Sequence, residues 1–432
     1  MTAVIATNQT IVVVGGGISG MTAALEAAEC GKQVVLIEKN PALGGRVSQL
    51  YKYFPKLCFP TCGLEINLRR IKANRNIHLL TMAEVEKITG TAGDFSVTVR
   101  IRPSYVTESC TACGDCAKAV NAEFANEFNF QMNQRKGAYL PFNLAYPQRY
   151  VLDPRIIGTP DADVAKAACK ANAINLEMQE EVLTLKAGAV IWATGWKPYN
   201  ADLIQPYGHD RFKNVITNME FERMLDPFGP TGGKIKRPSD GATPKNIAFI
   251  QCAGSRDVNH LSHCSRICCM ATLKQTTYVR EQLGDAAQSS IYYIDIRAID
   301  RIDDFHRRVK DDPNVTFIKS KVASITQDAT TGDLFLNGND LQKPGTGGDM
   351  RYKNRHDLVV LATGMEPSVR ADQIPADLTA NPHGFIELDA SKGIFGAGVS
   401  SEALDVNRAV QNATAAALRA IQIINRVAGV EG

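Results

Sequence analysis

The feature that most constrains the fold is a glycine-rich turn between two apolar strands near the start of the chain. Residues 11–14 read IVVV, a β-branched run typical of a buried parallel strand, and the turn GGGISG follows at residues 15–20. The next segment, MTAALEAAECGK, places small and apolar side chains at helical spacing, and VVLIEK predicts a second strand that ends at Glu38. This order of strand, turn, helix and strand predicts a dinucleotide-binding βαβ unit.

The residues of this turn have separate expected roles. Gly15 permits the tight turn, Gly17 lets the backbone approach a pyrophosphate, and Gly20 lets the helix pack closely on the strand. Glu38 stands where its carboxylate can accept a hydrogen bond from a ribose 2′-hydroxyl. The candidate dinucleotide-binding residues of this segment are Gly15, Gly17, Ser19, Gly20, Glu38 and Lys39.

Four later segments favour FAD as the dinucleotide, because they resemble flavoproteins with two dinucleotide-binding domains. NPALGGR, at residues 40–46, resembles the segment after the second strand of those proteins. AVIWATG (189–195) and LVVLATG (358–364) resemble the strands that return to their FAD sheet, and GIFGAGV (393–399) resembles their C-terminal flavin motif. Val399 departs from that motif, which usually has Asp there. The added candidate FAD contacts are Gly45, Arg46, Ala193, Thr194, Gly195, Gly364, Gly396 and Gly398.

Ten of the eleven cysteines fall into three groups, and Cys30 stands alone. Such tight spacing favours metal ligation in a reducing compartment over a disulfide framework. The segment CTACGDC places Cys110, Cys113 and Cys116 on one short loop, as in the first part of a ferredoxin cluster motif. Burial as small apolar side chains is the plainer alternative, and it suits Cys30 better than the grouped cysteines.

The ferredoxin-like segment is incomplete as a two-cluster motif. Val120 and Asn121 stand where such a ferredoxin would place Cys and Pro, yet the later segment KAACKANAI keeps Cys169. In two-cluster ferredoxins the last cysteine of each run ligates the other cluster, so Cys169 completes the set that begins at Cys110. This pattern predicts one 4Fe–4S cluster in a degenerate ferredoxin insert, with a four-cysteine zinc site as the rival.

The order of these motifs over about residues 10–425 resembles the A subunit of heterodisulfide reductases. The likeness is carried by the phrases FPTCGLEINLRRIKANRNIHLL, RKGAYLPFNLAYP and QCAGSRD followed by HCSRICCM. The compact length and incomplete insert most resemble the branch of that family found in the quinone-interacting membrane-bound oxidoreductase (Qmo) complexes of sulfate reducers. The resemblance implies an α/β fold with two Rossmann-like domains, as in thioredoxin reductase, and a ferredoxin-like insert.

The resemblance also implies a second 4Fe–4S cluster, on Cys252, Cys264, Cys268 and Cys269. The strand NIAFIQ runs into Cys252, where a flavoprotein of this layout should carry the glycines that bind NAD(P)H. The other three fall at the start of a predicted helix, MATLKQTTYVREQL, whose N-terminus favours bound negative charge. A redox-active dithiol is the alternative, although it needs only two cysteines. For Cys58 and Cys62, the sequence favours neither a packing role nor a redox role over the other.

Lys274 is the candidate catalytic residue. It lies five residues after Cys269, where the resemblance places a lysine near the flavin. A cation in that position would stabilise reduced, anionic flavin. The alternative is an ordinary solvated surface lysine.

The resemblance implies an electron-transfer role between a menaquinone-linked membrane partner and a cytoplasmic adenylylsulfate (APS) reductase, with bifurcation or confurcation at the flavin as an option. Its expected partners in the same complex are a membrane subunit with haem and iron–sulfur groups, and a second subunit with flavin and iron–sulfur groups. Three rivals stay open. They are a heterodisulfide reductase-like subunit of another sulfur pathway, a self-contained NAD(P)H-dependent disulfide or sulfide oxidoreductase, and a scaffold with a vestigial flavin site.

Composition narrows the location and partners further. A net charge of +3 over 432 residues, with no cluster of Lys and Arg, gives no support for nucleic-acid binding. No window of about 18 apolar residues predicts a membrane span. The first apolar run has no basic region before it, so a signal peptide is not expected. We therefore expect a cytoplasmic protein, and the partners that the resemblance implies would hold it at the inner face of the membrane.

We expect three domains. A discontinuous FAD domain covers residues 10–105, 180–240 and 355–432, and a predicted helix at about 402–427 closes its sheet. A ferredoxin-like insert covers residues 106–180. A degenerate nucleotide-binding-like domain covers residues 241–354 and carries the second cysteine group.

Overall fold

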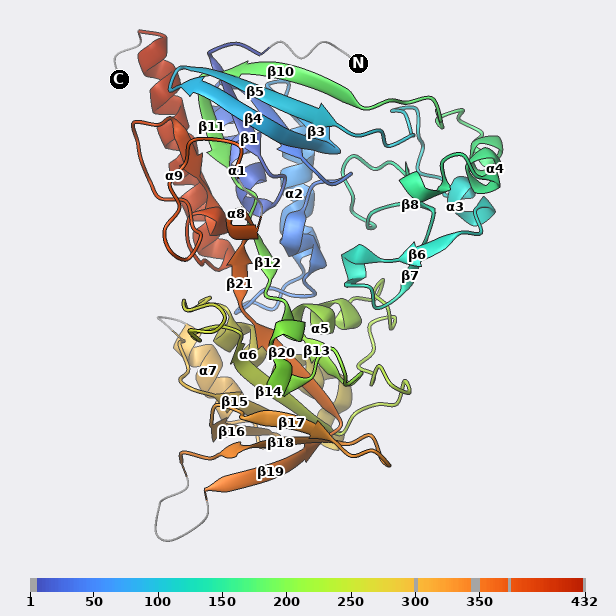
Figure 1. The fold of residues 1–432 in the computed structure, drawn as a ribbon, viewed down its shortest axis with the longest axis vertical. Coiled ribbons are helices and arrows are strands. Elements are labelled where there is room, and N and C mark those ends of the chain that lie inside the picture. Colours follow the sequence, from blue (N-terminus) through green and yellow to red (C-terminus); the bar gives the residue numbers. More distant parts are fainter. Residues whose placement is uncertain (1–5, 299–301, 343–349, 372–373, 430–432) are drawn as a thin grey trace. The chain divides into compact units, whose positions relative to one another are not determined.

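The computed structural model describes residues 6–298, 302–342, 350–371 and 374–429. The chain divides into two compact units (Figure 1). The first unit comprises Met1–Ser48, Thr61–Trp196 and Pro367–Gly432, and the second comprises Gln49–Pro60 and Lys197–Glu366. The chain passes between the units after Ser48 and after Pro60, and again at strands β12 (Trp196–Pro198) and β21 (Met365–Pro367).

A five-stranded parallel sheet, in the order β22-β11-β1-β2-β3, forms the centre of the first unit. Its strands are β1 (Thr10–Val14), β2 (Gln33–Glu38), β3 (Ile77–Thr81), β11 (Ala189–Trp192) and β22 (Ile394–Gly396). Helix α1 (Ile18–Glu29) packs against the terminal helix α9 (Val406–Val427), and both lie against this sheet (Figure 1). The predicted terminal helix is therefore confirmed. The unit also contains α2 (Pro60–Ala73) and α8 (Ser368–Ala371).

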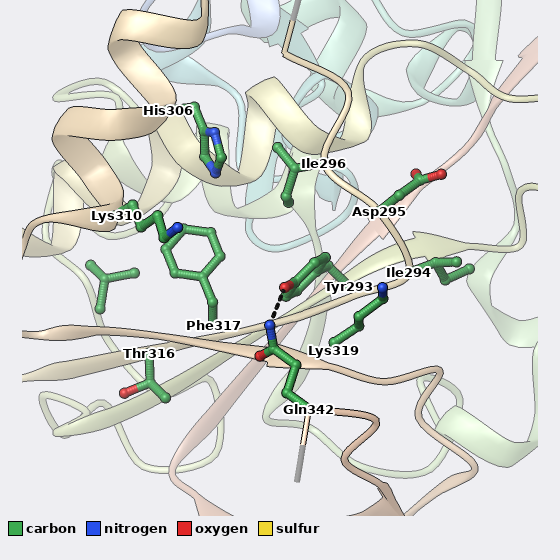
Figure 2. Close-up of a pocket in the computed structure, with 11 residues that line it drawn as sticks. Tyr293, Ile294, Asp295, Ile296, His306, Lys310, Thr316, Phe317, Lys319 and Gln342 are labelled. Carbon is green, nitrogen blue, oxygen red and sulfur yellow. Dashed lines mark hydrogen bonds between the residues drawn. The ribbon is translucent and has the colours of Figure 1, made fainter. Parts of the chain in front are cut away.

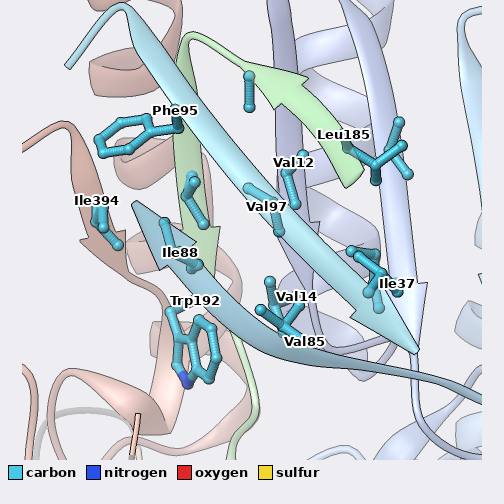
Figure 3. Packing of buried hydrophobic residues seen from close by; sticks show 14 of the residues in the cluster. Val12, Val14, Ile37, Val85, Ile88, Phe95, Val97, Leu185, Trp192 and Ile394 are labelled. Carbon is cyan, nitrogen blue, oxygen red and sulfur yellow. The ribbon is translucent and has the colours of Figure 1, made fainter. Parts of the chain in front are cut away.

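The other face of this sheet packs against a three-stranded antiparallel sheet. Its strands are β4 (Ala83–Thr91), β5 (Asp94–Ile101) and β10 (Glu181–Ala187), in the order β10-β5-β4. Because side chains alternate along a strand, every second residue of β5 faces the core, as Phe95, Val97 and Val99 show. These side chains pack on Val12 and Trp192 of the parallel sheet, which forms a continuous apolar core (Figure 3).

The insert between β5 and β10 has its own small core. It contains α3 (Asp115–Ala119), α4 (Pro160–Ala168) and four short strands, β6 (Glu123–Ala125), β7 (Gln134–Lys136), β8 (Ala138–Tyr139) and β9 (Val151–Leu152). Val106 and Ile174 form an antiparallel bridge that joins the two ends of the insert. Both residues are buried in the insert core, so its two cysteine-bearing ends are held together.

The second unit is a Rossmann-like sheet with a small antiparallel sheet beside it. The parallel sheet has the order β13-β20-β14-β15-β16, with strands β13 (Val215–Thr217), β14 (Asn246–Ala253), β15 (Gln288–Tyr293), β16 (Val315–Lys319) and β20 (Leu358–Thr363). The antiparallel strands are β17 (Ser324–Gln327), β18 (Leu334–Asn339) and β19 (Arg351–His356). The helices are α5 (Asn218–Leu225), α6 (Cys268–Leu283) and α7 (Ile302–Lys310).

The structure corrects one expectation about strand placement. LVVLATG does not return to the first sheet, because β20 pairs in parallel with β13 and β14 in the second. Residues 197–240 and 355–366 therefore group with the second unit, whereas we expected both stretches in the FAD domain. The apolar pattern of β20 suits the centre of either parallel sheet, so it identifies a buried strand but not its neighbours.

Candidate functional site

The turn between β1 and α1 has the close approaches that require glycine. Gly15 has a φ of +108°, and a Cβ there would lie 2.4 Å from the carbonyl oxygen of Ala193. A Cβ on Gly20 would lie 1.7 Å from the carbonyl oxygen of Gly15, so helix and strand meet with no room for a side chain. A Cβ on Gly17 would meet only the Cα of Gly45, at 3.8 Å. The open side of the turn is therefore at Gly17, where the helix N-terminus favours an anionic pyrophosphate.

Glu38 is buried at the end of β2 and holds this turn in place. Its Oε2 accepts a hydrogen bond from the N–H of Gly16 (2.6 Å). Its Oε1 accepts from the N–H (2.8 Å) and the side-chain amide (2.7 Å) of Asn40. Burial raises the pKa of the Glu38 carboxyl above its ordinary value, although these hydrogen bonds oppose the shift. Oε2 keeps one lone pair, so the predicted contact with a ribose hydroxyl is compatible with the site and stays a prediction. Lys39 is exposed.

The segment after β2 folds back onto the glycine turn. A Cβ on Gly45, whose φ is +55°, would lie 2.8 Å from the Cα of Gly17. The next residue, Arg46, donates from Nε to the carbonyl oxygen of Trp196 at 3.1 Å. Burial lowers the pKa of this guanidinium from its ordinary value. Gly45 and Arg46 thus lie with the turn in the first unit, as the sequence predicts.

Two loops that are distant in sequence meet within the first unit. The N–H of Gly195 donates to the Oγ of Ser400 at 3.1 Å, and the hydroxyls of Thr194 and Ser400 lie 3.5 Å apart. Gly398 has a φ of +62°, and a Cβ there would lie 2.0 Å from the Oγ of Ser19. The structure therefore brings these candidate FAD residues together with the β1–α1 turn. Gly396 ends β22, which pairs with β11 in the same sheet.

The sequence reasoning missed two residues that fix these loops. Ser400 is fully buried, and Asn412 of α9 accepts a hydrogen bond on Oδ1 from the N–H of Gly398 (2.8 Å). The serine pair that follows the flavin motif was the available signal for Ser400. No local pattern marks Asn412, because it lies 14 residues from its partner. Val399, which stands where Asp was expected, is buried.

Gly364 lies elsewhere. It follows β20 in the second unit, where a Cβ would lie 2.2 Å from the Oγ of Ser255. Ser255 belongs to the loop that carries the second cysteine group, and its hydroxyl hydrogen-bonds that of Ser265 at 2.9 Å. Within its unit, Gly364 therefore allows a strand end to lie close to the cysteine loop.

Three of the four cysteines of the insert pack at its apolar core. Cys116 lies in α3 and is buried, Cys110 and Cys169 pack against the same core, and Cys113 is exposed. Burial raises the pKa of the Cys116 thiol to about 11, and the neighbouring cysteines add to this rise. Two sulfurs accept backbone hydrogen bonds: Cys110 from Ala112 (3.4 Å) and Cys169 from Ala173 (3.3 Å).

The second cysteine group lies between β14 and α6. Cys252 has a φ of +56° near the end of β14, and Cys268 and Cys269 open α6, as predicted. The N–H of Arg266 donates to the Sγ of Cys264 at 3.4 Å.

The thiols of this group differ in acidity. A hydrogen bond from Cys268 lowers the pKa of the Cys252 thiol to about 7, and the nearby Arg256 assists against the effect of burial. Burial raises the pKa of the Cys269 thiol to about 11. The Sγ of Cys269 accepts from the N–H of Arg297 at 3.4 Å. Across the described stretches of the chain, no group of three or more His, Cys, Asp or Glu side chains is placed to hold a metal ion.

Lys274 is a buried lysine rather than a solvated one. Its Nζ lies 2.9 Å from Oε1 of Glu222 and donates to the carbonyl oxygen of Lys52 at 2.7 Å. All three residues belong to the second unit. The ammonium is therefore neutralised by a buried carboxylate, and the predicted role beside a flavin stays a prediction. Cys58 and Cys62 are both exposed.

A cavity of about 650 Å³ opens beside the second parallel sheet (Figure 2). It is lined by Tyr293, Ile294, Asp295, Ile296, His306, Lys310, Val315, Thr316, Phe317, Lys319 and Gln342. None of the described cysteines lines it. One of its lining residues, Asp295, contacts the second cysteine group, because its backbone carbonyl accepts from the Sγ of Cys269 at 3.6 Å.

Relatives of known class match almost the whole chain. The FAD dependent oxidoreductase family matches residues 10–204. The chain is 36% identical over 422 residues to the second iron–sulfur A subunit of CoB–CoM heterodisulfide reductase of Methanopyrus kandleri, a match over 94% of this chain and 63% of that protein. It is 35% identical over 431 residues to the iron–sulfur A subunit of CoB–CoM heterodisulfide reductase of Methanocaldococcus jannaschii, covering 96% and 64%. The chain is therefore a relative of heterodisulfide reductase A subunits with an FAD dependent oxidoreductase region at residues 10–204.

This heterodisulfide reductase A-like flavoprotein spans less than two thirds of the length of those relatives. Solved structures confirm its predicted thioredoxin-reductase-like fold. Thioredoxin reductase of Lactococcus lactis (FR conformation) has a TM-score of 0.53 at 12% identity and covers 97% of this chain and 99% of its own. Thioredoxin reductase of T. acidophilum has a TM-score of 0.51 at 14% identity, covering 96% and 98%. Of the helices that the structure describes, none has both the length and the apolar character needed to cross a membrane.

Proposed function

We propose that this flavoprotein is an electron-transfer subunit that holds FAD and two 4Fe–4S clusters. One cluster is assigned to Cys110, Cys113, Cys116 and Cys169, and the other to Cys252, Cys264, Cys268 and Cys269. The carrying observation is a backbone device that both cysteine loops share. In each loop, the residue two positions after a cysteine has a positive φ, Ala112 at +56° and Arg266 at +58°. Each of these residues donates its N–H to the sulfur of that cysteine.

This device suits thiolate ligands. A backbone N–H that points at sulfur stabilises the anionic form that a metal cluster requires, and such hydrogen bonds also tune the cluster. In a cubane each thiolate binds a different iron, so the four sulfurs surround the cluster rather than meet at one point. The donor set and its backbone support therefore fit iron–sulfur ligation in both loops.

The residues of the first unit fit FAD. Bound FAD exchanges two electrons, whereas a 4Fe–4S cluster exchanges one. The turn at Gly17 offers backbone N–H groups to the pyrophosphate. Glu38 is fixed where it can accept from a ribose hydroxyl, and Ser400 holds the 193–195 loop against the end of β22.

The proposed setting is a multisubunit complex of sulfate respiration on the cytoplasmic side of the membrane. In it the chain passes electrons between APS reductase and a menaquinone-linked membrane subunit, with a second flavin and iron–sulfur subunit beside it. The missing fourth ferredoxin cysteine, replaced here by Val120, supports this branch. A tagged chain, purified in detergent from native membranes, should bring a haem subunit with it.

A second candidate rests on the hydrogen bond between Cys252 and Cys268. A thiol whose pKa is lowered to about 7, beside a partner thiol, is typical of a disulfide oxidoreductase. In that case the chain would reduce a disulfide or sulfur substrate with electrons from NAD(P)H. It predicts rapid flavin reduction by NAD(P)H in the isolated protein.

Anaerobic iron, acid-labile sulfide and FAD analysis separates these candidates. The wild type should contain about eight iron atoms per FAD, and Cys252→Ala and Cys113→Ala should each contain about four. Cys30→Ala is the matched control, since Cys30 is exposed and outside both groups, and it should keep about eight. About four iron atoms in both the wild type and Cys252→Ala would overturn the second cluster and favour the dithiol.

A further inference from the structure

Gln251 is a buried polar residue whose side-chain amide is only partly hydrogen-bonded when the neighbouring cysteines are thiols. It lies on β14 directly before Cys252 and is 5% exposed. Its Oε1 lies 3.5 Å from the Sγ of Cys269, and it shares the single proton of that thiol with the backbone carbonyl of Asp295, at 3.6 Å. Its Nε2 is buried and has no hydrogen-bond partner among the residues that the structure describes. A buried amide N–H₂ without a partner carries a desolvation cost that folding normally avoids.

If Cys269 ligates a metal, its sulfur changes from a hydrogen-bond donor to an acceptor, and Gln251 must then supply the donor. A cysteine loses its proton when it binds a metal, so its sulfur can then only accept hydrogen bonds. The carbonyl oxygen of Gln251 would face a thiolate, whereas its amide nitrogen would still lack an acceptor. A half-turn of the amide exchanges the two groups with almost no change of shape, because the amide oxygen and nitrogen are nearly equal in size. The thiolate of Cys269 then has a hydrogen-bond donor, and the amide nitrogen of Gln251 has an acceptor.

We propose that Gln251 donates a hydrogen bond from Nε2 to the Sγ of Cys269 in the cluster-bearing protein, and thereby raises the reduction potential of that cluster. This inference rests on the second cluster proposed above. A donor beside a ligating sulfur stabilises the reduced, more negative cluster more than the oxidised one. The N–H of Arg297, 3.4 Å from the same sulfur, already acts in this sense, so Cys269 accepts from two sides. Gln251 is a tuning residue and takes no part in electron transfer itself.

Potentiometric titration followed by electron paramagnetic resonance tests the proposal. The signal to follow is the one that disappears in Cys269→Ala. Gln251→Met keeps the size of the side chain but cannot donate, so the potential of that signal should fall. Gln251→Glu should also lower it where the carboxyl is ionised, and it serves as the second variant if Met at this position prevents cluster retention. Thr276→Val is the matched control, because Thr276 is buried on α6 and its hydroxyl donates to the carbonyl of Leu273 instead.

The outcomes distinguish a failure of this inference from a failure of the proposed second cluster. An unchanged potential in Gln251→Met and Gln251→Glu, with the signal intact, would overturn the role of Gln251 and leave the second cluster standing. An equal fall in Thr276→Val would also overturn it, since any disturbance of α6 would then suffice. Iron and sulfide contents that do not change in Cys269→Ala would remove both the cluster and the inference, and this result is seen in the metal analysis rather than in a potential.

Discussion

The ion pair between Lys274 and Glu222 is the most heavily buried charge pair that the structure describes in the second unit. The side chains are 4% and 2% exposed, and Nζ lies 2.9 Å from Oε1. Glu222 also accepts from the side-chain amide of Gln275 (2.8 Å) and the backbone N–H of Tyr51 (2.9 Å). The pair therefore joins α5 and α6 to the segment 49–60, which is contributed from a distant part of the chain.

Lys274→Met removes the cation and leaves the carboxylate buried without a counter-ion. Removing one partner of a buried pair typically costs about 3–5 kcal/mol, because the remaining charge keeps its desolvation penalty. Glu222 retains other donors, so we expect about 3 kcal/mol, near the lower end. The double variant Lys274→Met with Glu222→Gln replaces the charge by a neutral amide of the same size. It should recover at least half of this loss.

The assay must report on the second unit. Both tryptophans, Trp192 and Trp196, lie in the first unit, so tryptophan fluorescence is unsuitable. Hydrogen exchange of peptides from α6 gives the local free energy of unfolding around the ion pair. Urea unfolding followed by circular dichroism gives the global value for comparison. A loss below about 1 kcal/mol in Lys274→Met, or a double variant less stable than the single one, would refute the reasoning. A shifted flavin potential with unchanged stability would instead support the predicted flavin role of Lys274.

Two further predictions concern the FAD loops and pH. Gly398→Ala should purify without FAD, because its Cβ would lie 2.0 Å from the Oγ of Ser19, and visible absorbance measures this loss. Gly232→Ala is the control, since Gly232 has a similar φ of +63° but open space around it, and this variant should keep FAD. Against the effect of burial, the hydrogen bonds that His209 donates to the carboxylates of Glu220 and Asp202 raise its pKa to about 9. Since the ordinary value is 6.5, this histidine stabilises the fold most below pH 6.5, and up to about 3 kcal/mol is lost as pH rises through 9. Urea unfolding at pH 6 and pH 10 should show that loss in the wild type and little of it in His209→Gln, and equal losses in both would contradict the assignment.

Local constraints made parts of the molecule predictable. The β1–α1 turn was predictable because Gly15 and Gly20 face backbone at distances that exclude any side chain, and such positions leave glycine in the sequence. The helix predicted over MATLKQTTYVREQL is present as α6, and it begins two residues earlier than predicted, at Cys268. The neighbours of β20 were not, because an apolar run states that a strand is buried without stating which strands flank it.

The partners of the buried polar groups were out of reach for a different reason. Glu222 meets Lys274 across 52 positions, and Ser400 meets Gly195 across 205. Each pairing depends on how distant elements pack, and no spacing rule along the chain expresses it. Gln251 adjoins Cys252 in the sequence, yet its contact is with Cys269, on the following helix. The sequence therefore predicts which cysteines form the proposed site, whereas the contact between Gln251 and Cys269 is found only in the fold.

The two βα connections of the parallel sheets suit the two kinds of anion that we propose for this chain. In the first unit, β1 is joined to α1 by three residues, 15–17, and the short turn brings backbone N–H groups to a pyrophosphate. In the second unit, β14 is joined to α6 by fourteen residues, 254–267, and cysteines lie at both ends of this longer loop. The N-terminus of a helix favours negative charge in either case, whether phosphate or thiolate supplies it. A longer connection with cysteines in place of glycines therefore still places negative charge at the N-terminus of a helix, as the Rossmann turn does. For this reason the proposed cluster would lie where a nicotinamide dinucleotide would otherwise bind.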